Sequence, residues 1–454
     1  MADLRMMIYN HSPIWAQSVF TTAQGFRHAK RRYGRVYREY LEELRHRDYS
    51  DADEQKQYQD RRFVELVNYA VRNSPFYKEY YAAVDLNSIK GAQDVTKFPI
   101  LEKETVRKNI ARFYTLHPKD GIVSSTSGTT GTPMNVVYTH EDLQRRLAYL
   151  DSFKAQHGVI ANKTRRASFT TAKIVPPKQR SKVFWRDNLS IKQRLYSGYH
   201  CRGSNIEFYL ENLNEYRPVS LDGLPSALYE LARYIIDESI KLTFTPVAIF
   251  PTAETLLPHY KTAIQEAFGC PVRDQYASSE GAPFITECKC GRLHYNMDTG
   301  IIEVDNDGEM IVTCFETHGT PLIRYRIGDK VVMADPDERC ACGSSHPVVR
   351  EIQGRGNDYL VSRTNGKFTA IYLSLVSEEF MNSVRRMQFI QDSIDQIDIL
   401  VEADEHYRPE MNQIIVDKLK YSFGEDMSFV VHVVDEIPKE PSGKYRFIKN
   451  NLAV

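Results

Sequence analysis

A short segment rich in hydroxyl groups and glycine is the first part of this sequence that suggests chemistry. Residues 124–133 read SSTSGTTGTP and contain no charged side chain. Glycine allows backbone N–H groups to converge on a bound anion, and serine and threonine hydroxyls can donate to phosphate oxygens. The segment lacks the lysine of the G-x-x-x-x-G-K-[ST] nucleotide loop, and many surface loops have a similar composition. By itself it leaves a phosphate site and a plain linker both open.

Cysteine spacing suggests a second kind of chemistry. Four of the seven cysteines lie in two similar segments, CKCG at 288–291 and CACG at 340–343. Two such segments suit one tetrahedral Zn²⁺ of the structural type, because four protein ligands leave no open position for a substrate. The expected ligands are Cys288, Cys290, Cys340 and Cys342, and His294 competes for one of these positions. Unliganded buried thiols are the alternative.

Six segments match, in order, the signatures of one enzyme superfamily. They are SSTSGTTGTP (124–133), TAE (252–254), DQYASSE (274–280), RYRIGD (324–329), GRGND (354–358) and PKEPSGKYR (438–446). A single match of this kind is weak, whereas six in the same order are specific. The chain therefore resembles the adenylate-forming ligases, in particular their phenylacetate–CoA ligase branch. The segments GAPFITEC and TPLIRYRIGD most resemble the CapK-like, polysaccharide-linked members of that branch.

The resemblance implies that ATP and a carboxylic acid react to form an acyl-adenylate and release pyrophosphate. The nucleotide would contact Ser127, Gly128, Thr129, Thr130, Gly131, Ala253, Glu254, Asp274, Tyr276, Ser278, Ser279, Asp329 and Arg355. Glu280 is expected to hold Mg²⁺, because a hard cation that bridges phosphates accepts carboxylate oxygens. Lys444, on a turn of the C-terminal domain, would supply the positive charge that the phosphate loop lacks. Outside these motifs, Glu280, Asp329 and Lys444 would be ordinary surface residues.

Two positions depart from the pattern of the family. Thr132 stands where phenylacetate ligases commonly have lysine, so the loop has one positive charge fewer. Ala277 stands where glycine is usual, which would narrow the carboxylate pocket toward small acids.

The acceptor of the acyl group stays open at this level. The branch as a whole transfers the acyl group to coenzyme A, but the CapK-like resemblance also permits an amine or an amino sugar. Residues 362–370, SRTNGKFTA, replace the glycine-rich strand that is typical of thioester formers. An alternative from another class of function is a non-catalytic descendant that only binds nucleotide. We would expect such a protein to lose Lys444 or Glu280 first, and both are present.

These residues require an α/β fold to bring them together. The first 95 residues have helical spacing, and between about residue 120 and 350 short β-branched runs alternate with helical segments, as in PVAIF (246–250) followed by PHYKTAIQEAF (258–268). That alternation indicates an α/β domain with partly parallel sheets. We therefore predict an N-terminal adenylation domain at 1–353, with 1–95 as a helical lead-in, and a small mobile α+β domain at 354–454.

Composition excludes several classes of function. The 454 residues include 59 basic and 59 acidic side chains, so no net charge favours nucleic acid. No apolar run approaches the length of a membrane span or of a signal peptide, which predicts a cytoplasmic protein with reduced cysteines. The basic segment at 27–38 fits either a solvated helix face, which acidic Glu39, Glu42 and Glu43 favour, or contact with a membrane surface or acidic partner. We expect a homodimer.

Overall fold

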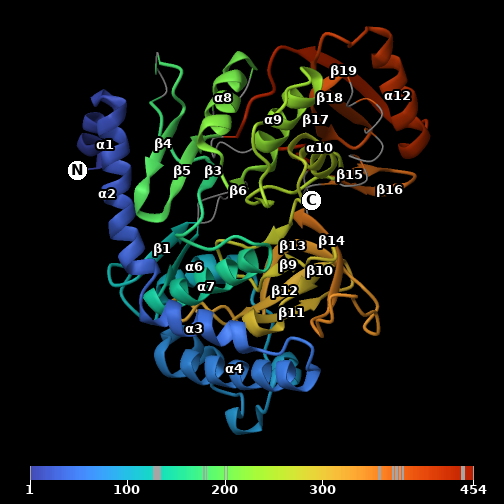
Figure 1. Ribbon diagram of the computed structural model, residues 1–454. Helices are drawn as coiled ribbons and strands as arrows, with labels where there is room; N and C mark the ends of the chain where they lie inside the picture. The colour runs from blue at the N-terminus through green and yellow to red at the C-terminus, as the bar shows by residue number, and fades with distance from the viewer. Residues whose placement is uncertain are drawn as a thin grey trace. The chain divides into compact units, whose positions relative to one another are not determined.

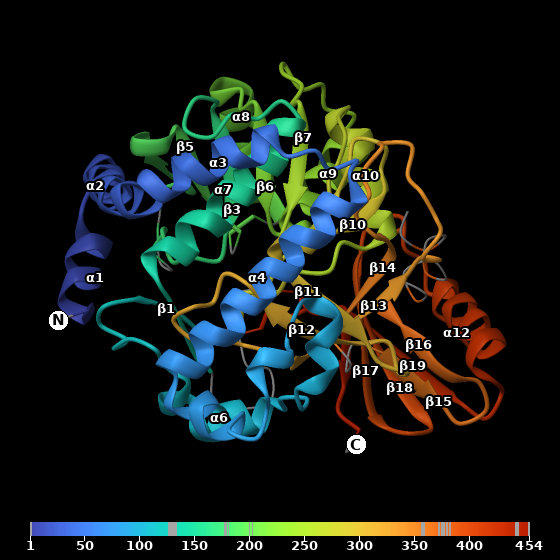
Figure 2. The same cartoon turned by 90° about the horizontal axis from the view of Figure 1, so that it is seen from below.

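The computed structural model describes residues 2–125, 134–176, 179, 181–198, 200–201, 203–355, 359–370, 373, 377, 380, 383–440 and 445–452 (Figures 1 and 2). The chain forms two compact units. Unit 1 comprises Met1–Thr164, Asp187–Gln193 and Arg273–Ile352. Unit 2 comprises Arg165–Arg186, Arg194–Val272 and Gln353–Val454.

Unit 1 begins with helices, as the sequence predicts. They are α1 Ala2–His11, α2 Ile14–Arg32, α3 Arg35–His46, α4 Ala52–Asn73, α5 Pro75–Tyr80, η1 Leu86–Ser88, η2 Ala92–Lys97, α6 Lys103–Phe113, α7 His140–Gln156 and η3 Leu189–Ile191. Helix α3 buries Tyr37, Tyr40 and Leu44, whose spacing places them on one face. Asp51 begins α4, because its carboxylate accepts hydrogen bonds from the amides of Asp53 and Glu54.

A seven-stranded sheet forms most of the remainder of unit 1. Its strands, in spatial order, are β11 Gly300–Val304, β12 Glu309–Cys314, β13 Tyr325–Met333, β14 Val348–Arg355, β10 Leu293–Tyr295, β9 Ile285–Glu287 and β8 Gln275–Tyr276, with η5 at Met297–Thr299. The last three residues of β14, 353–355, belong to unit 2. Helix α4 lies beside β11 in Figure 2. The amide of Gln59 on α4 donates to the carbonyl oxygen of Gly300 at 2.7 Å, which fixes the helix against that strand.

A separate hairpin in unit 1 flanks the predicted phosphate loop. Strands β1 Ile122–Ser125 and β2 Asn135–Tyr138 pair antiparallel, and the loop residues 126–133 between them lie outside the described residues. Helix α7 follows β2 directly. Thr139 and Asp142 form a capping box at its first turn, each side chain accepting a hydrogen bond from the backbone amide of the other residue at 2.9 Å.

Unit 2 contains most of a five-stranded sheet covered by helices. Its strands, in order, are β4 Trp185–Asn188, β5 Gln193–Ser197, β3 Arg166–Thr170, β6 Ser220–Gly223 and β7 Ala248–Pro251, and its helices are η4 Gly203–Asn205, α8 Ile206–Tyr216, α9 Pro225–Asp237 and α10 Pro258–Phe268. The last two residues of β4 and the first residue of β5 belong to unit 1. Strands β3, β6 and β7 are parallel. Gly223 is required at the end of β6, since a Cβ there would lie 2.1 Å from the carbonyl oxygen of Phe169.

The C-terminal residues of unit 2 form an α+β module. The elements are β15 Tyr359–Ser362, β16 Gly366–Thr369, β17 Val384–Ser393, β18 Gln396–Ala403, α12 Glu410–Phe423, β19 Ser428–Val434 and β20 Ile448–Asn450. Four of them form a sheet in the order β19-β18-β17-β20, and a second pair forms the β15–β16 hairpin. Ile415, Leu419 and Phe423 bury one face of α12 in the hydrophobic core of the unit.

The predicted α/β class is confirmed. Helix α10 spans the predicted 258–268. The division at residue 353–354 stays a prediction: the units do separate at Ile352, but Gln353–Val454 shares its unit with Arg165–Arg186 and Arg194–Val272. Within the described residues, no helix has the length and apolar character needed to cross a bilayer.

Candidate functional site

Two residues predicted at the nucleotide site meet in unit 1. The hydroxyl of Tyr276 on β8 donates to Oδ2 of Asp329 on β13 at 2.6 Å, across 53 positions of sequence. Burial, followed by the charge of Asp329, raises the pKa of Tyr276 well above its ordinary value, so the phenol stays protonated and acts as the donor. The pair therefore presents a flat ring beside a carboxylate of fixed orientation, which suits a base and a ribose.

Glu280 lies near this pair and next to a lysine. Its side chain is buried, with 4% exposure, and its charge is one cause of the raised pKa of both Tyr276 and Tyr325. Nζ of Lys103 lies 3.8 Å from Oε1 of Glu280. A buried carboxylate with a lysine beside it is suited to bind a further cation once phosphate oxygens neutralise the lysine.

Sequence reasoning missed Lys103, and the structure shows why it lies there. Leu101 forms a parallel bridge with Tyr325 of the RYRIGD segment, and the amide of Leu101 donates to the carbonyl oxygen of Arg324 at 2.8 Å. Lys103, the first residue of α6, follows this bridge by two positions. No spacing within FPILEKE indicates the contact, because its partner lies about 180 residues away in the sequence.

The other predicted residues of DQYASSE have structural contacts. The carboxylate of Asp274 accepts from the amide of Gln275 at 2.8 Å. The hydroxyl oxygen of Ser278 accepts from the amide of Ala282 at 3.1 Å, and the carbonyl oxygen of Ser279 accepts from the hydroxyl of Tyr138 at 2.8 Å. The last of these bonds holds the turn that carries Glu280 against β2, the strand that follows the phosphate loop.

A second set of bonds fastens the same strand to the segment before β13. The hydroxyl of Thr320 accepts from the amide of Val137 at 2.8 Å and donates to its carbonyl oxygen at 3.2 Å. Gly319 allows this approach, since a Cβ there would lie 2.4 Å from the carbonyl oxygen of Val137. Strand β2 of the phosphate-loop hairpin is therefore held at Tyr138 by Ser279 and at Val137 by Thr320.

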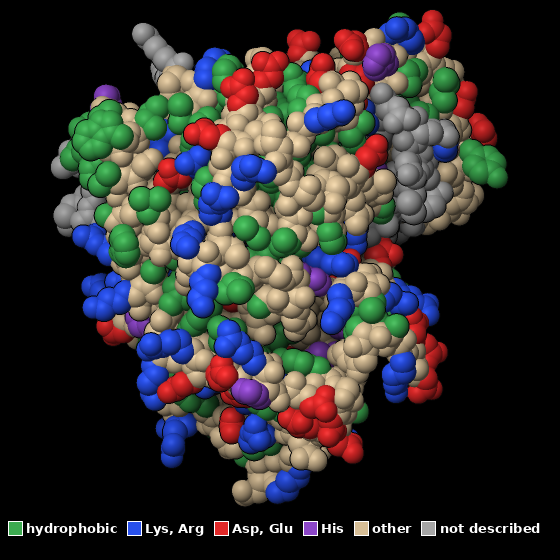
Figure 3. Space-filling model, in the orientation of Figure 1, with side chains coloured by type: hydrophobic (Ala, Val, Ile, Leu, Met, Phe, Trp, Pro, Cys, Tyr) green, Lys and Arg blue, Asp and Glu red, His purple; other side chains and the backbone are tan. Residues whose placement is uncertain are grey.

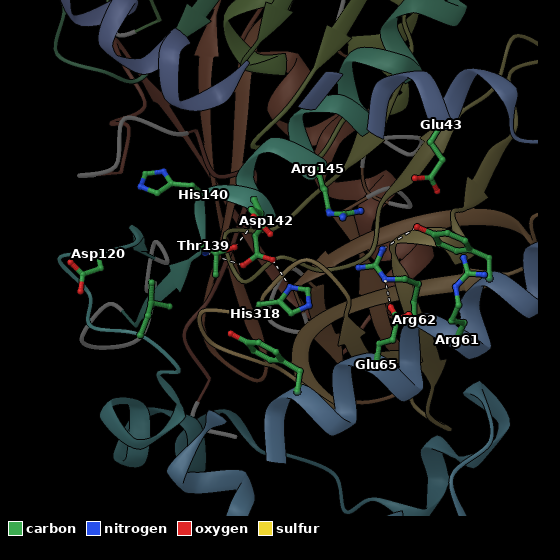
Figure 4. Close-up of a pocket in the computed structure, with 14 residues that line it drawn as sticks. Glu43, Arg61, Arg62, Glu65, Asp120, Thr139, His140, Asp142, Arg145 and His318 are labelled. Carbon is green, nitrogen blue, oxygen red and sulfur yellow. Dashed lines mark hydrogen bonds and ion pairs between the residues drawn. The ribbon is translucent and has the colours of Figure 1, made fainter. Parts of the chain in front are cut away.

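Asp142 and His318 extend this attachment to α7. Nδ1 of His318 lies 2.6 Å from Oδ1 of Asp142, whose carboxylate is fully buried, and Figure 4 shows the imidazole turned toward the carboxylate. Burial alone lowers the pKa of His318, but the hydrogen bond and the charge of Asp142 outweigh it, so the net shift is upward. Burial likewise opposes ionisation of Asp142, but the bonds from His318 and Thr139 lower its pKa.

The same pair borders a cavity of about 600 Å³ in unit 1 (Figure 4). Arg62 also lines it and binds Oε1 of the buried Glu316 at 2.9 Å. Asp142, Glu316 and His318 lie close enough to hold a metal ion, their candidate ligand atoms being within 4.8 Å of one another. Arg62 already binds the carboxylate of Glu316, and His318 binds that of Asp142. The charges of the cluster are therefore balanced without a metal ion.

In unit 2, Glu254 of the TAE segment holds two other elements. Its carboxylate accepts from the amide of Ser226 at 3.0 Å, at the first turn of α9, and from the amide of Tyr445 at 2.9 Å. Ala253 has a φ of 74°, a strained conformation for a residue other than glycine. Tyr445 follows the predicted catalytic Lys444 directly, so Glu254 anchors the end of the segment that carries this lysine.

Several predicted residues lie outside the part of the chain that the structure describes. They are Ser127, Gly128, Thr129, Thr130, Gly131 and Lys444, together with Thr132 and the side chain of Arg355. Their roles stay predictions.

The cysteine segments converge in unit 1. Each forms the same turn: the amide of Gly291 donates to the carbonyl oxygen of Cys288 at 3.0 Å, and that of Gly343 to the carbonyl oxygen of Cys340 at 3.1 Å. Both glycines have positive φ, 79° and 86°. The first segment precedes β10 and the second precedes β14. Because these two strands pair, the two segments come together.

Four residues form the group with metal-binding geometry: Cys288, His294, Cys340 and Cys342, whose ligand atoms lie within 4.8 Å of one another. The sulfurs of Cys288 and Cys340 are 3.7 Å apart, and Sγ of Cys342 is 3.5 Å from Nε2 of His294. Ligand atoms about 2.3 Å from a tetrahedral Zn²⁺ lie roughly 3.7 Å apart, so the distances fit this ion.

The environment of His294 fits a metal ligand. Its Nδ1 lies 3.0 Å from the carbonyl oxygen of His346 and donates to it, which leaves the lone pair of Nε2 directed at Cys342. Burial lowers the pKa of His294, which favours the neutral imidazole that a metal requires. Cys290 is exposed and borders the cluster, since Cys288 and Cys340 are among the causes of the raised pKa of its thiol. The choice between His294 and Cys290 stays a prediction, with this geometry on the side of His294.

Comparison with known proteins supports the motifs. The chain is 40% identical over 452 residues to protein CapK of Staphylococcus aureus, a match that covers 98% of this chain and 99% of that protein. The chain belongs to the CapK family of the adenylate-forming superfamily. A family model for the CapK C-terminal domain also matches residues 360–451.

More distant relatives extend the same relationship. The phenylacetate–coenzyme A ligase of Thermus thermophilus is 24% identical over 396 residues, covering 79% of this chain and 83% of that protein. A 2-hydroxyisobutyryl-CoA ligase, solved in the postadenylation state in complex with R3-HIB-AMP, has the same fold: its TM-score is 0.68 at 16% identity, with 86% of this chain and 88% of that chain covered. The CapK family thus shares its fold with ligases, and the predicted superfamily and branch are confirmed.

Proposed function

We propose that this CapK-family chain is an ATP-dependent ligase that activates a carboxylic acid as its acyl-adenylate, releases pyrophosphate and transfers the acyl group to an acceptor. The observation that carries the proposal is the meeting of Tyr276, Asp329 and Glu280 in unit 1, from motifs that lie apart in the sequence. The relationship to phenylacetate–coenzyme A ligases supports it. Coenzyme A is the leading acceptor, and an amine or amino sugar is the alternative.

In this proposal each residue of the group has a distinct task. Tyr276 stacks on the adenine and orients Asp329, which accepts hydrogen bonds from the ribose hydroxyls. Glu280 holds Mg²⁺, which when bound would neutralise charge on the phosphate oxygens. The carboxylate oxygen of the acid attacks the α-phosphorus, and the bond from that phosphorus to the bridging oxygen of pyrophosphate breaks.

The positive charge that the phosphate loop lacks has two proposed sources. Lys444 would reach the reacting phosphate and carboxylate in the adenylation step, because preorganised charge is most effective where charge develops. Lys103 is the second, since it already lies beside Glu280 and is 32% exposed. Lys103 would thus supply the positive charge that related ligases have at the position of Thr132. Thr132 itself lies outside the described residues.

The Cys–His cluster is proposed to hold a structural Zn²⁺. Cys288, Cys340, Cys342 and His294 would be its ligands, and the ion would fasten the turns before β10 and β14 in unit 1. All four positions are occupied by protein atoms, so the ion would take no part in the reaction.

The decisive experiment is acid-dependent pyrophosphate release from Mg·ATP over a panel of carboxylic acids. Hydroxylamine traps the adenylate as a hydroxamate, so adenylation is detected without knowing the acceptor. Faster turnover with coenzyme A selects the thioester reaction, and faster turnover with an amine or amino sugar selects the amide reaction. Absence of pyrophosphate release over a broad panel, with ATP still bound, would favour a non-catalytic nucleotide-binding descendant.

A further inference from the structure

The N-terminal helices carry a cluster of exposed apolar side chains. Its members are Met6 (41% exposed), Met7 (55%), Ile8 (50%), Trp15 (71%), Val19 (58%), Phe20 (47%) and Phe26 (62%). Figure 3 shows hydrophobic side chains gathered over α1 and α2, with Lys and Arg side chains below them. Scattered exposed apolar residues are normal, but a contiguous group of this size marks a binding surface.

The spacing on α2 places the members of the group on this helix in two neighbouring rows. Trp15, Val19 and Phe26 are separated by four and seven positions, so they lie in one row along the helix, and Lys30 continues that row. Phe20 with Arg27 and Arg31 forms the neighbouring row by the same spacing. The ring of Tyr9 on α1 lies 6.4 Å from the ring of Phe20, which joins the two helices. We call the seven apolar residues with Arg27, Lys30 and Arg31 the N-terminal face.

The charge of this segment differs from that of the chain. Residues 4–38 contain seven Lys and Arg and no Asp or Glu, although the whole chain has a formal net charge of zero. Arg27, Lys30 and Arg31 are exposed, and no described residue forms an ion pair with any of them. The acidic Glu39, Glu42 and Glu43, which favour a solvated face from sequence, bind other partners: Arg35 for the first, Arg45 and His46 for the second, and Arg47 for the third.

We propose that the N-terminal face binds the surface of a membrane that contains anionic lipid. Trp15, Val19 and Phe26 would insert at the boundary between headgroups and acyl chains, where aromatic rings are favoured. Arg27, Lys30 and Arg31 would contact the lipid phosphates. No helix of the described chain is long and apolar enough to span the bilayer, so α2 lies in the plane of the interface.

The charges argue against a second copy of the chain as the occupant. A symmetric dimer through this face would bring the same surface of two chains together. The face contributes no carboxylate, so its guanidinium and ammonium groups would lose water without gaining an acidic partner. Lipid phosphates supply that partner.

The two tryptophans of the chain allow a direct test. In protein carrying Trp185→Phe, Trp15 is the single tryptophan, and excitation at the red edge of the absorption band selects it over the tyrosines. We expect its emission to shift to the blue, and brominated lipid to quench it, with vesicles of phosphatidylcholine and phosphatidylglycerol. Phosphatidylcholine alone should give little effect, and added salt should weaken binding. Equal binding to both vesicles, or none to the anionic ones, would overturn the proposal.

Variants separate the two parts of the face in vesicle co-sedimentation. Trp15→Ser with Phe26→Ser should weaken binding to anionic vesicles about tenfold or more, and each of Lys30→Gln and Arg31→Gln about fivefold. Tyr421→Ser is the matched control, because Tyr421 is an exposed aromatic residue (91%) on α12 of unit 2. Circular dichroism checks that the variants fold. Concentration-dependent self-association that is lost in the Trp15 and Phe26 double variant would assign the face to a second copy instead.

Discussion

The Cys–His cluster and the Tyr276–Asp329–Glu280 group are built differently. All candidate metal ligands belong to unit 1 and come from two glycine turns and the strand β10. The residues predicted for the reaction are divided: Tyr276, Glu280 and Asp329 belong to unit 1, whereas Glu254, Arg355 and Lys444 belong to unit 2. A metal centre within one unit stabilises that unit by itself. The residues predicted for the reaction, in contrast, are not all supported by one unit.

The metal cluster should show the largest effect. Cys340→Ser removes a ligand common to both candidate sets, so we expect loss of bound Zn²⁺ and a fall of about 4 kcal/mol or more in the free energy of unfolding. Metal analysis of protein purified without added metal, together with urea denaturation, measures both. Cys290→Ser and His294→Ala then decide the fourth ligand: we expect the first to keep the ion and the second to lose it. A Zn²⁺ content well below one per chain in fully active wild-type protein would contradict the metal proposal.

Lys444→Ala tests the residue of unit 2 that is proposed to act in the reaction. We expect pyrophosphate release to slow by about 100-fold or more, because a positive charge at the reacting phosphate is lost. ATP binding, measured by calorimetry, should change little, since Tyr276 and Asp329 belong to the other unit. Lys420→Ala, on α12 of unit 2, is the control and should leave the rate unchanged. An equal loss in both variants would count against a specific role of Lys444.

Tyr276→Phe tests the part of the reaction site that lies within unit 1. Loss of the 2.6 Å bond to Asp329 should cost about 1.5–3 kcal/mol of unfolding free energy, the usual value for a hydrogen bond to a charged group. Because Asp329 also loses its orientation, we expect KM for ATP to rise more than kcat falls. Tyr295→Phe is the control: this buried tyrosine bonds Gln59 and Gly300, so it should cost stability without changing KM.

The smallest effect concerns the Asp142–His318 pair. The pKa of His318 is raised in the folded state. Its contribution to the free energy of unfolding is therefore complete below the unfolded-state pKa of about 6.5 and is lost as pH rises through the folded-state pKa. The pKa of Asp142 is lowered, so its stabilisation is complete above about 4 and is lost as pH falls through its folded value.

Arg62, Glu316 and Tyr69 also face the imidazole of His318. Between the two pH limits, the pair contributes about 1–2 kcal/mol to the free energy of unfolding. His318→Gln should therefore lower the unfolding free energy at pH 6 and have less effect at pH 9. His432→Gln, at an exposed pair with Asp398, is the control for replacing a histidine beside an aspartate. A constant loss across this range would assign His318 a packing role instead.

Local patterns explain how much the sequence could predict. Helix α10 matches its predicted limits because its apolar spacing lies within the segment and Pro258 and Gly269 mark its two ends. The order of the motifs predicted Tyr276 and Asp329 at one site. Lys103 and His318 were missed, because their contacts join segments that only the fold brings together. The position of His294 beside the cysteines likewise depends on the pairing of β10 with β14, which no spacing reveals.

The bonds between Thr320 and Val137 have a consequence for synthesis of the chain. The hairpin that flanks the phosphate loop is complete once residue 138 has been made, yet its second strand is held by a residue that leaves the ribosome 183 positions later. Long-range contacts of this kind form late, because the intervening chain must first be ordered. A nascent chain that ends before Thr320 would therefore carry the phosphate-loop sequence without its supporting contacts, and nucleotide binding should begin only after the segment 317–329 has emerged.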